Sequence, residues 1–329
     1  MNRLPQGLEA FLAASGWEGA SIAPLPGDAS FRRYFRIARG GGKAMLMHAP
    51  PPEEDPGEFL DVTRYLNEQG MRAPAIFAAK PEDGWVLLED FGDHRMRDWL
   101  DDNPQHEEAT YARAIDALVD LHAKPAGPFS PYDMATYHRE VDLFVEWYCP
   151  AKQLAVDSRS WTAAWEEVLA PLHARQQPGV TVLRDYHAEN IMLPAPEEDG
   201  CGEQGLIDYQ DALVGHRAYD LVSLLQDARR EVSPELESRM FQRYLSKVDA
   251  GKDFAADYAR LGAQRNAKIV GIFSRLWKRD DKPRYLSLIP RVWQAMERDL
   301  AHPALAPVSA WFDANIPQGI RDNFGGEIG

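Results

Sequence analysis

The stretch that decides the fold is RDYHAEN at residues 184–190, which is followed downstream by LIDYQ at residues 206–210. These stretches place Asn190 five residues after Asp185 and put a second aspartate, Asp208, behind a short apolar run. An aspartate in such a loop can orient and deprotonate a hydroxyl group, while an asparagine and a further aspartate can supply oxygen ligands to a magnesium ion that bridges the phosphates of ATP. The order and spacing of the three side chains therefore predict a site for phosphoryl transfer.

The sequence between the two motifs predicts a hairpin. Residues 191–193 are apolar and form one candidate strand, residues 205–207 form the returning strand, and the segment between them is rich in proline, glycine and acids. The folded hairpin would bring Asp208 beside Asn190, where two oxygen ligands can reach one cation. The alternative interpretation is ordinary turn chemistry, since aspartate and asparagine both favour loops.

Length and composition are those of a soluble enzyme. The chain has 329 residues, of which 45% are hydrophobic and 26% are charged, and it is long enough for two lobes with ample core. The net charge of −15 argues against nucleic acid or an anionic membrane as the main partner, because both are polyanions. A monomer is the default expectation.

The sequence gives no indication of export. Cys149 and Cys201 have no paired spacing, so neither a disulfide framework nor a zinc site is indicated. Residues 8–14 are apolar but interrupted by Glu9 and lack a basic leader, which favours a packed helix over a signal peptide. No uncharged apolar stretch approaches the length of a membrane span. We therefore expect a reducing, cytoplasmic location.

A basic segment stands out on this acidic chain. Residues 29–52 contain no acid and five cations, namely Arg32, Arg33, Arg36, Arg39 and Lys43. The alternation over residues 31–37 and the apolar residues 44–47 predict two strands joined across the glycines at 40–42. One interpretation is a solvated basic hairpin. The other is an electrostatic lid over nucleotide phosphates, with the small residues at 27–30 letting backbone amides approach phosphate.

The remaining pattern divides the chain into a β-rich part and a helical part. Up to residue 90 we expect strands, turns and one helix over residues 58–69, with a buried strand at 85–89 that ends at a hinge, residues 90–92. Beyond it the apolar period is helical, including a block from 234 to about 301 and a loosely docked tail after His302. The predicted fold is α+β with two lobes, a small β-rich lobe of residues 1–90 and a larger, mainly helical lobe of residues 91–329. Three predicted apolar helix faces are made by Tyr111, Ile115, Leu118 and His122; by Val141, Phe144, Val145 and Tyr148; and by Trp161, Trp165, Leu169 and Leu172.

These stretches resemble the aminoglycoside phosphotransferase and choline kinase superfamily, which has the bilobal protein-kinase-like fold, and the resemblance covers nearly the whole chain. Within the superfamily, GDASFRRYFR at 27–36, RDYHAEN at 184–190, and IDYQDA at 207–212 with YDLVSLL at 219–225 are similar to one branch. That branch is the anomeric kinase acting on N-acetylmuramate and N-acetylglucosamine in bacterial cell-wall recycling. The resemblance implies transfer of the γ-phosphate of ATP, with Mg²⁺, to the C1 hydroxyl of an amino sugar. A nucleotidyltransferase could convert the resulting sugar 1-phosphate to a UDP-sugar.

The resemblance also implies roles for particular residues. Asp185 matches the catalytic base, and Asn190 and Asp208 match the magnesium ligands. Asp220 matches a buried aspartate that steadies the catalytic loop, and Arg184 would support the same loop. The residues expected to contact the nucleotide are Ser30, Phe31, Arg32 and Arg33 near the phosphates, and Leu87, Glu89 and Phe91 in the segment whose backbone meets adenine.

The chain departs from the family pattern at two places. Leu183 stands where protein kinases begin the catalytic loop with histidine, and Met47 or His48 stands where the superfamily strand carries its phosphate-binding lysine. The second departure removes a cation next to the phosphates, and such a cation contributes to stabilising transition-state charge. Our hypothesis is that Arg32 or Arg33 supplies the missing charge, helped by Arg36 or Lys43.

The acceptor pocket is the least determined part. Side chains that could bind a pyranose through hydrogen bonds or flat apolar faces are Glu146, Trp147, His187, Glu189, Arg217 and Trp277. Helical spacing also allows Trp147 and Trp277 to be core residues. Two alternatives stay open: a kinase of the same fold acting on an aminoglycoside, choline or another sugar, and a nucleotide-binding pseudokinase that works as a scaffold. The presence of Asp185, Asn190 and Asp208 disfavours the scaffold, because a scaffold has no need for all three.

Overall fold

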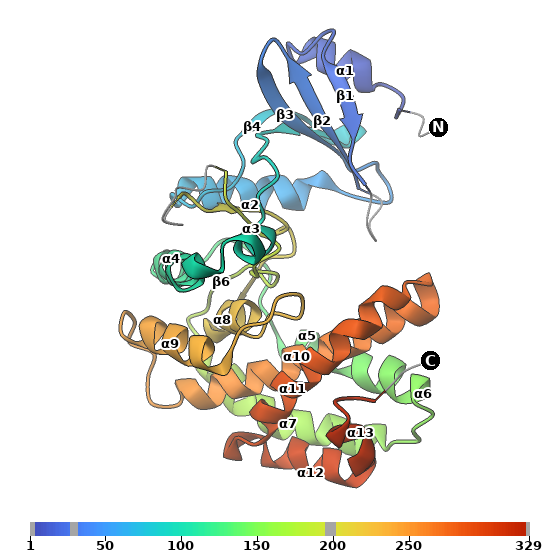
Figure 1. The fold of residues 1–329 in the computed structure, drawn as a ribbon, viewed down its shortest axis with the longest axis vertical. Helices are drawn as coiled ribbons and strands as arrows, with labels where there is room; N and C mark the ends of the chain where they lie inside the picture. Colours follow the sequence, from blue (N-terminus) through green and yellow to red (C-terminus); the bar gives the residue numbers. More distant parts are fainter. Residues whose placement is uncertain (1–3, 27–31, 195–201, 327–329) are drawn as a thin grey trace. The chain divides into compact units, whose positions relative to one another are not determined.

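The computed structural model describes residues 4–26, 32–194 and 202–326. The chain forms two compact units, one from Met1–Trp99 with Asn190–Asp211 and one from Leu100–Glu189 with Ala212–Gly329 (Figure 1). The first unit holds an antiparallel sheet and the second is mainly helical, which confirms the predicted α+β class. The lobe boundary expected at residue 90 stays a prediction. By its contacts, the segment that carries Asn190 and Asp208 belongs with the N-terminal residues.

The sheet of the first unit has five antiparallel strands. Gly40 and Gly41, with φ of 58° and 87°, form the tight turn between the second and third strands, where a side chain would strain the backbone. The two strands predicted around this turn are confirmed. The strands follow one another across the sheet in the order β1 (Ser21–Pro24), β2 (Arg33–Arg39), β3 (Gly42–His48), β5 (Trp85–Leu88) and β4 (Ile76–Lys80).

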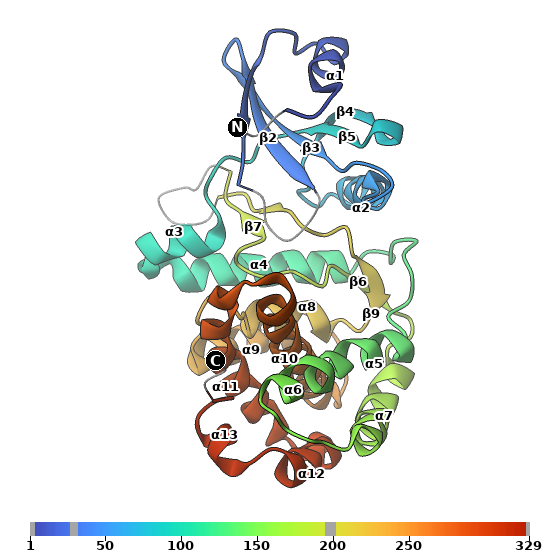
Figure 2. The same cartoon turned by 90° about the vertical axis from the view of Figure 1, so that its right-hand side faces the viewer.

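One face of the sheet is covered by α1 (Leu8–Ala14), as expected for a packed helix (Figure 2). Because side chains alternate between the two faces of a strand, Tyr34 and Arg36 of β2 and Met47 of β3 lie on the face opposite α1. The buried cluster between sheet and helix contains Leu8, Phe11, Leu12, Phe35, Ile37, Ala44, Leu46, Trp85 and Leu87.

A helix and a two-stranded hairpin also belong to the first unit. Helix α2 (Pro56–Glu68) begins at Asp55, whose side chain accepts a hydrogen bond from Gly57 N at 2.8 Å. Strands β7 (Ile191–Met192) and β8 (Gly205–Leu206) pair antiparallel, which confirms the hairpin predicted from the sequence.

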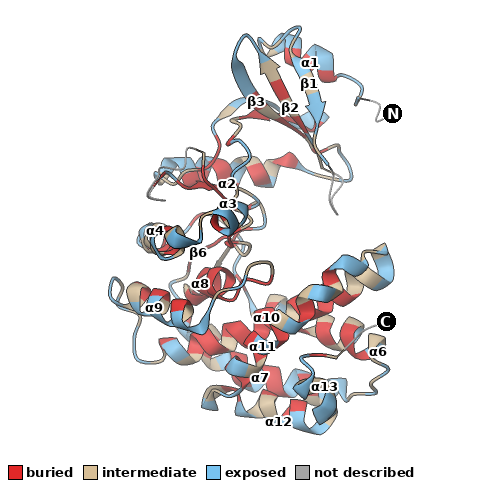
Figure 3. Ribbon diagram, in the orientation of Figure 1, coloured by how far each residue is buried: buried red, intermediate tan, exposed pale blue. Residues whose placement is uncertain are grey.

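The second unit contains a two-stranded sheet, β6 (Val180–Val182) with β9 (Leu213–Gly215), among helices (Figure 2). A π-helical turn, η3 (Phe144–Tyr148), follows α5. Figure 3 shows α8 as one of the most completely covered helices, and all of its eight residues are buried. The helices after residue 90 are α3 (Met96–Asp102), which begins in the first unit, and then α4 (Glu107–His122), α5 (Met134–Leu143), α6 (Cys149–Ala151), α7 (Ser158–Arg175), α8 (Ala218–Leu225), α9 (Pro234–Leu245), α10 (Phe254–Asp280), α11 (Ile289–Leu300), α12 (Ala306–Asn315) and α13 (Gln318–Asp322).

The expectation of a loosely docked tail after His302 is wrong. Trp311 and Phe312 of α12 are 4% and 0% exposed, and their rings lie 4.6 and 6.1 Å from the ring of Trp161 between centroids. The aromatic side chains bury enough apolar area to fix the segment, despite its prolines and glycines. The three predicted apolar helix faces are buried apart from a half-buried Val145. Over the described residues, none of the helices has the length and hydropathy that crossing a bilayer requires.

Candidate active site

Asp220 in the first turn of α8 holds the backbone of the loop that follows β6. Asp220 accepts hydrogen bonds from the backbone N–H groups of Leu183 and Arg184, at 2.7 and 2.9 Å. Burial raises the pKa of Asp220 to about 7, although the two N–H donors act in the opposite direction. Arg184 has a left-handed φ of 69°, and its carbonyl oxygen accepts from Ser223 Oγ at 3.2 Å. Helix α8 therefore fixes the backbone just before Asp185.

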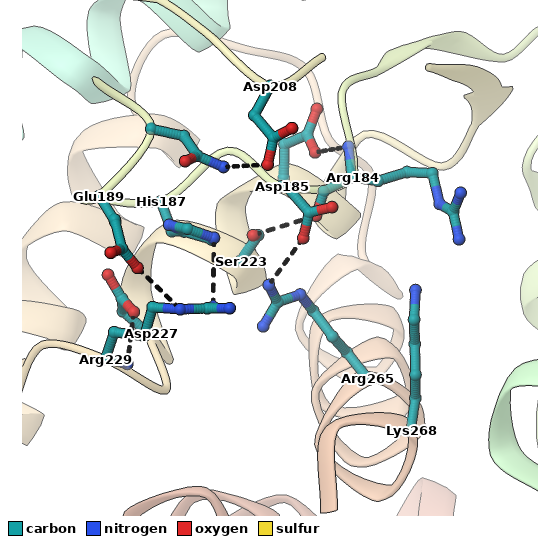
Figure 4. A network of polar contacts seen from close by, with 12 residues as sticks. Arg184, Asp185, His187, Glu189, Asp208, Ser223, Asp227, Arg229, Arg265 and Lys268 are labelled. Atoms are coloured by element: carbon teal, nitrogen blue, oxygen red, sulfur yellow. Dashed lines mark hydrogen bonds and ion pairs between the residues drawn. The ribbon is translucent and has the colours of Figure 1, made fainter. Parts of the chain in front are cut away.

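A second aspartate fixes the other end of the loop. Asp227 accepts from Ala188 N at 3.1 Å and from Arg229 N at 2.7 Å. The Arg229 side chain pairs with Glu189 at 2.7 Å and lies 3.4 Å from His187 Nε2 (Figure 4). Burial lowers the pKa of His187, and the Arg229 charge adds to this effect, so the ring is neutral at pH 7. His187 and Glu189 thus lie close to Asp185 in the sequence, and both contact the Arg229 side chain.

Asp185 is reachable from solvent and surrounded by cations. Its side chain is 47% exposed, and Arg265 Nη2 of α10 lies 3.9 Å from Asp185 Oδ1. Burial would raise the pKa of Asp185, but the positive groups around it, among them Lys268, Arg265 and Arg184, lower the pKa below its ordinary value. Asp185 is therefore ionised at neutral pH and can accept a proton from a hydroxyl group.

A buried carboxylate organises two of these cations. Glu140 of α5 accepts from Lys268 Nζ at 2.8 Å and forms an ion pair with Arg184. It also accepts from Gln264 Nε2 at 3.1 Å and from the Tyr132 hydroxyl. Burial opposes the ionised form of Glu140, yet Lys268 and Arg184 lower its pKa to about 2. Glu140 therefore remains a carboxylate at pH 7 and neutralises part of the positive charge.

The predicted magnesium ligands meet on the hairpin. Asn190 Nδ2 lies 3.3 Å from Asp208 Oδ2, and Ile207 N donates to the Asn190 carbonyl oxygen at 3.1 Å. Asp208 has a left-handed φ of 60°, and its Oδ1 accepts from Gln210 Nε2 at 3.1 Å. One carboxylate and one amide are a donor set that suits Mg²⁺, which takes oxygen ligands and keeps several waters. The residues present therefore fit the ion.

Of the four residues expected near the phosphates, Ser30 and Phe31 lie outside the described residues. Arg32 pairs with Glu54 at 3.0 Å and is 15% exposed. Burial would lower the pKa of Arg32, but attraction to Tyr34, Glu54 and Asp208 raises it. The Arg33 guanidinium instead lies 5.3 Å from the centroid of Phe35, whose ring belongs to the cluster under α1. The structure therefore turns Arg32 and Arg33 toward different surroundings.

The other basic residues of this segment also have defined places. Arg36 pairs with Asp90 at 2.7 Å and with Asp93 at 2.9 Å. Lys43 is exposed on β3. Met47 is buried and accepts a weak hydrogen bond from the Tyr34 hydroxyl at 3.5 Å, whereas the His48 ring stacks on Trp85 with 4.0 Å between centroids.

Arg72 contacts two residues of the segment that is expected to bind adenine. Arg72 pairs with Glu89 at 2.5 Å, and its guanidinium carbon lies 4.6 Å above the Phe91 ring. The hydrogen bonds from Arg72 lower the pKa of Glu89, which is consequently ionised at neutral pH. Leu87 is fully buried in β5, which pairs with β3 on one side and with β4 on the other, and its side chain belongs to the cluster under α1, so the structure does not support a ligand contact by Leu87.

The remaining acceptor candidates are scattered. Glu146 is exposed and Trp147 half-buried on η3, and Trp277 is half-buried on α10 with Lys278 Nζ 3.8 Å from its ring centroid. Arg217 lines a cavity of about 300 Å³ together with Arg175, His216 and Asp257, and the lining of that cavity does not include Asp185. The structure thus does not bring Arg217 to the Asp185 carboxylate.

Several residues of the site have little or no signal in the sequence. Glu140, Asp227, Arg265 and Lys268 surround the loop at 184–190 but lie far from it along the chain. The weak signal for two of them is the presence of Arg265 and Lys268, three residues apart, within a long and mostly buried helix.

Comparisons with known proteins identify the family and the fold of the chain. The model of the phosphotransferase enzyme family matches residues 21–263. An N-acetylmuramate/N-acetylglucosamine kinase of Caulobacter vibrioides is 37% identical, over 95% of this chain and 96% of that protein. A protein of the same name from Pseudomonas aeruginosa is 36% identical, over 95% of each. The ADP-bound structure of aminoglycoside phosphotransferase APH(2'')-Ib has a TM-score of 0.60 at 12% identity, covering 89% of this chain and 99% of its own, and supports the kinase-like fold.

Proposed function

Because the chain belongs to the phosphotransferase enzyme family, we propose that it transfers the γ-phosphoryl group of ATP to the anomeric C1 hydroxyl of N-acetylmuramate or N-acetylglucosamine. The acceptor is inferred from the relatives in Caulobacter vibrioides and Pseudomonas aeruginosa, which are named for these two sugars. The observation that carries the reaction type is Asp185, a half-exposed carboxylate on a loop whose backbone is held by Asp220.

Asp185 acts on the acceptor hydroxyl as a base and an orienting group. The C1 oxygen attacks the γ-phosphorus, its proton passes to Asp185, and the bond to the bridging oxygen breaks to release ADP. An anomeric hydroxyl is more acidic than an ordinary alcohol because the ring oxygen withdraws electron density. A carboxylate whose pKa is lowered by nearby cations can therefore still serve. The protein's main contributions are alignment and charge neutralisation.

Asn190 and Asp208 would hold magnesium. When bound, the ion would neutralise charge on the phosphate oxygens. The hairpin β7–β8 contributes the two side chains at a fixed separation, since their 3.3 Å contact lies next to a backbone hydrogen bond between Ile207 and Asn190.

We assign to Arg32 the role of the phosphate-binding lysine, which the superfamily carries on the strand where this chain has Met47 or His48. Arg33 is directed to Phe35, whereas Arg32 pairs with Glu54 just before α2 and is attracted to Asp208. In protein kinases the strand lysine is ion-paired to a glutamate of the neighbouring helix, and the pair of Arg32 with Glu54, which precedes α2, offers the same combination of charges.

The proposed product gives the reaction a place in metabolism. A sugar 1-phosphate is the substrate that a nucleotidyltransferase requires to form a UDP-sugar, so we expect such an enzyme to act next. A cytoplasmic location, where ATP is available, fits this role in recovering cell-wall sugars.

Magnesium-dependent ADP release with a panel of acceptors tests the proposal. N-Acetylmuramate, N-acetylglucosamine, choline and kanamycin are each added to the full-length protein, and the phosphorylated product is identified by ³¹P NMR. We expect stimulation by one or both amino sugars and a phosphate on C1. Stimulation by choline or kanamycin would identify another acceptor, and no stimulation by any of the four would favour a scaffold.

Asp185→Asn tests the assigned base. We expect kcat to fall by roughly 100- to 10,000-fold, with both KM values changed little, because the interaction with Asp185 matters mostly in the transition state. Asp61→Asn is the control, since Asp61 is 66% exposed and pairs with Arg64 on the surface of α2. Equal activity of the two variants would remove Asp185 from this role.

A further inference from the structure

One cation reaches Asp185 from outside the catalytic loop. Arg265 extends from α10, and its Nη2 atom lies 3.9 Å from Asp185 Oδ1 (Figure 4). The Arg265 side chain is 4% exposed and that of Asp185 is 47% exposed, so the guanidinium approaches the carboxylate from the protein interior. We propose that Arg265 is a positioning residue that holds the Asp185 carboxylate in the orientation needed to accept the proton of the acceptor hydroxyl. This inference rests on the function proposed above.

The burial of Arg265 supports a dedicated role. A buried guanidinium is costly unless it is paired, because it loses its hydration. Within the part of the chain that the structure describes, Asp185 is the one carboxylate at ion-pair distance from Arg265, and Arg265 Nη1 has no hydrogen-bond partner. Among the described residues Arg265 has no other ion pair within 4.0 Å, although its charge also acts to lower the pKa of the buried Asp220.

The neighbouring cations have a different task. Lys268 and Arg184 both bind the buried Glu140, whose side chain is 6% exposed. Lys268 lies one turn beyond Arg265 in α10, yet its ion pair is with Glu140 rather than Asp185. Arg265 is thus the member of this group that α10 directs at the reactive carboxylate.

Helix α10 is closely packed and can therefore hold Arg265 in a fixed position. It has 27 residues, and a Cβ atom added at Gly262 would lie 2.3 Å from Asp299 Oδ2, while one added at Gly271 would lie 2.3 Å from the Leu143 backbone. This close packing on both sides of Arg265 fixes the position of the helix. A side chain on a rigid element can position its partner more accurately than one on a loop.

The test compares substitutions of Arg265 in the full-length protein. We expect Arg265→Gln to lower kcat by about 10- to 100-fold, while KM for ATP and for the acceptor stays within about threefold, because a poorly aligned Asp185 affects the transition state more than binding. Arg265→Lys should lose less of its kcat, since lysine keeps the positive charge although it lacks the planar guanidinium group. Millimolar guanidinium should restore part of the activity of Arg265→Ala but none of that of Asp185→Asn.

Arg279→Gln is the matched control, because Arg279 lies on the same helix, is exposed and pairs with Asp280. The acceptor is whichever sugar or alcohol stimulates ADP release by the wild-type protein, and water if none does, so the amino-sugar proposal can fail without affecting this comparison. A kcat for Arg265→Gln within twofold of the control would overturn the inference. So would a lower unfolding midpoint of Arg265→Ala with no rescue by guanidinium, since that combination indicates a purely structural role.

Discussion

Two adjacent arginines on the same segment have different surroundings, and this difference can be measured. We expect Arg32→Ala to raise KM for ATP by about tenfold or more, because it removes a charge-assisted contact to phosphate. Arg33→Ala should change ATP kinetics by less than twofold, since the Arg33 guanidinium lies over Phe35. Steady-state kinetics at fixed acceptor concentration checks both variants. If both leave KM for ATP unchanged, the phosphate-binding cation lies elsewhere.

Glu140 shows how one buried carboxylate affects both stability and its dependence on pH. Glu140→Gln should lower the free energy of unfolding by about 3–5 kcal/mol, because Lys268 and Arg184 would lose their common counter-ion. The pKa of Glu140 is about 2 in the folded protein and about 4.3 in an unfolded chain, so this contribution is complete above pH 4.3 and is lost as the pH falls toward 2.

Urea unfolding of wild type and Glu140→Gln at pH 7 and pH 3 measures this difference, and it should shrink at pH 3. Glu166→Gln is the control, because Glu166 is 59% exposed and should contribute less than about 1 kcal/mol. A Glu140→Gln protein as stable as this control at pH 7 would contradict the assignment.

At the scale of elements, local patterns predicted well where the chain folds back on itself. The pairing of β2 with β3 and of β7 with β8 follows from alternation and turn residues in adjacent segments. The π-helical turn after α5 interrupts a face whose spacing looked regular, and the C-terminal helices were missed because aromatic contacts with distant helices hold them. For the same reason Glu140 and Arg265 were missing from the predicted site, since tertiary packing alone brings Glu140 to Arg184 and Arg265 to Asp185.

The hairpin β7–β8 can be tested as an element through Gly205. A Cβ atom at this position would lie 2.5 Å from Phe91 Cε2, and Phe91 is buried beneath Arg72. We expect Gly205→Ala to cost about 1–3 kcal/mol of stability and to raise the Mg²⁺ concentration for half-maximal activity, because the hairpin carries Asn190 and Asp208. Gly319→Ala is the control, since nothing lies within 4 Å of its added Cβ atom. An unchanged Mg²⁺ requirement would separate the hairpin from the metal site.

At the scale of the whole molecule, the proposed machinery is divided between two compact units. Asn190, Asp208 and Arg32 belong to the unit with the sheet, whereas Asp185 and Arg265 belong to the helical unit. The chain passes between the units after residues 99, 189 and 211, so neither unit is one continuous segment. Patterns along the sequence predicted lobes at a single boundary and could not reveal this arrangement, because it depends on contacts between distant segments.

This division predicts that nucleotide binding and catalysis can be separated. Magnesium and ATP together should raise the thermal midpoint of the wild-type protein, since a ligand at 100 times its Kd stabilises the folded state by about 2.7 kcal/mol. Asp208→Asn should lose the magnesium-dependent part of this shift, because it removes the carboxylate ligand. Asp185→Asn should keep the full shift and lose turnover, because Asp185 acts on the acceptor. Differential scanning fluorimetry with ATP, with and without Mg²⁺, distinguishes the variants, and an equal magnesium-dependent shift in wild type and Asp208→Asn would exclude Asp208 as a ligand.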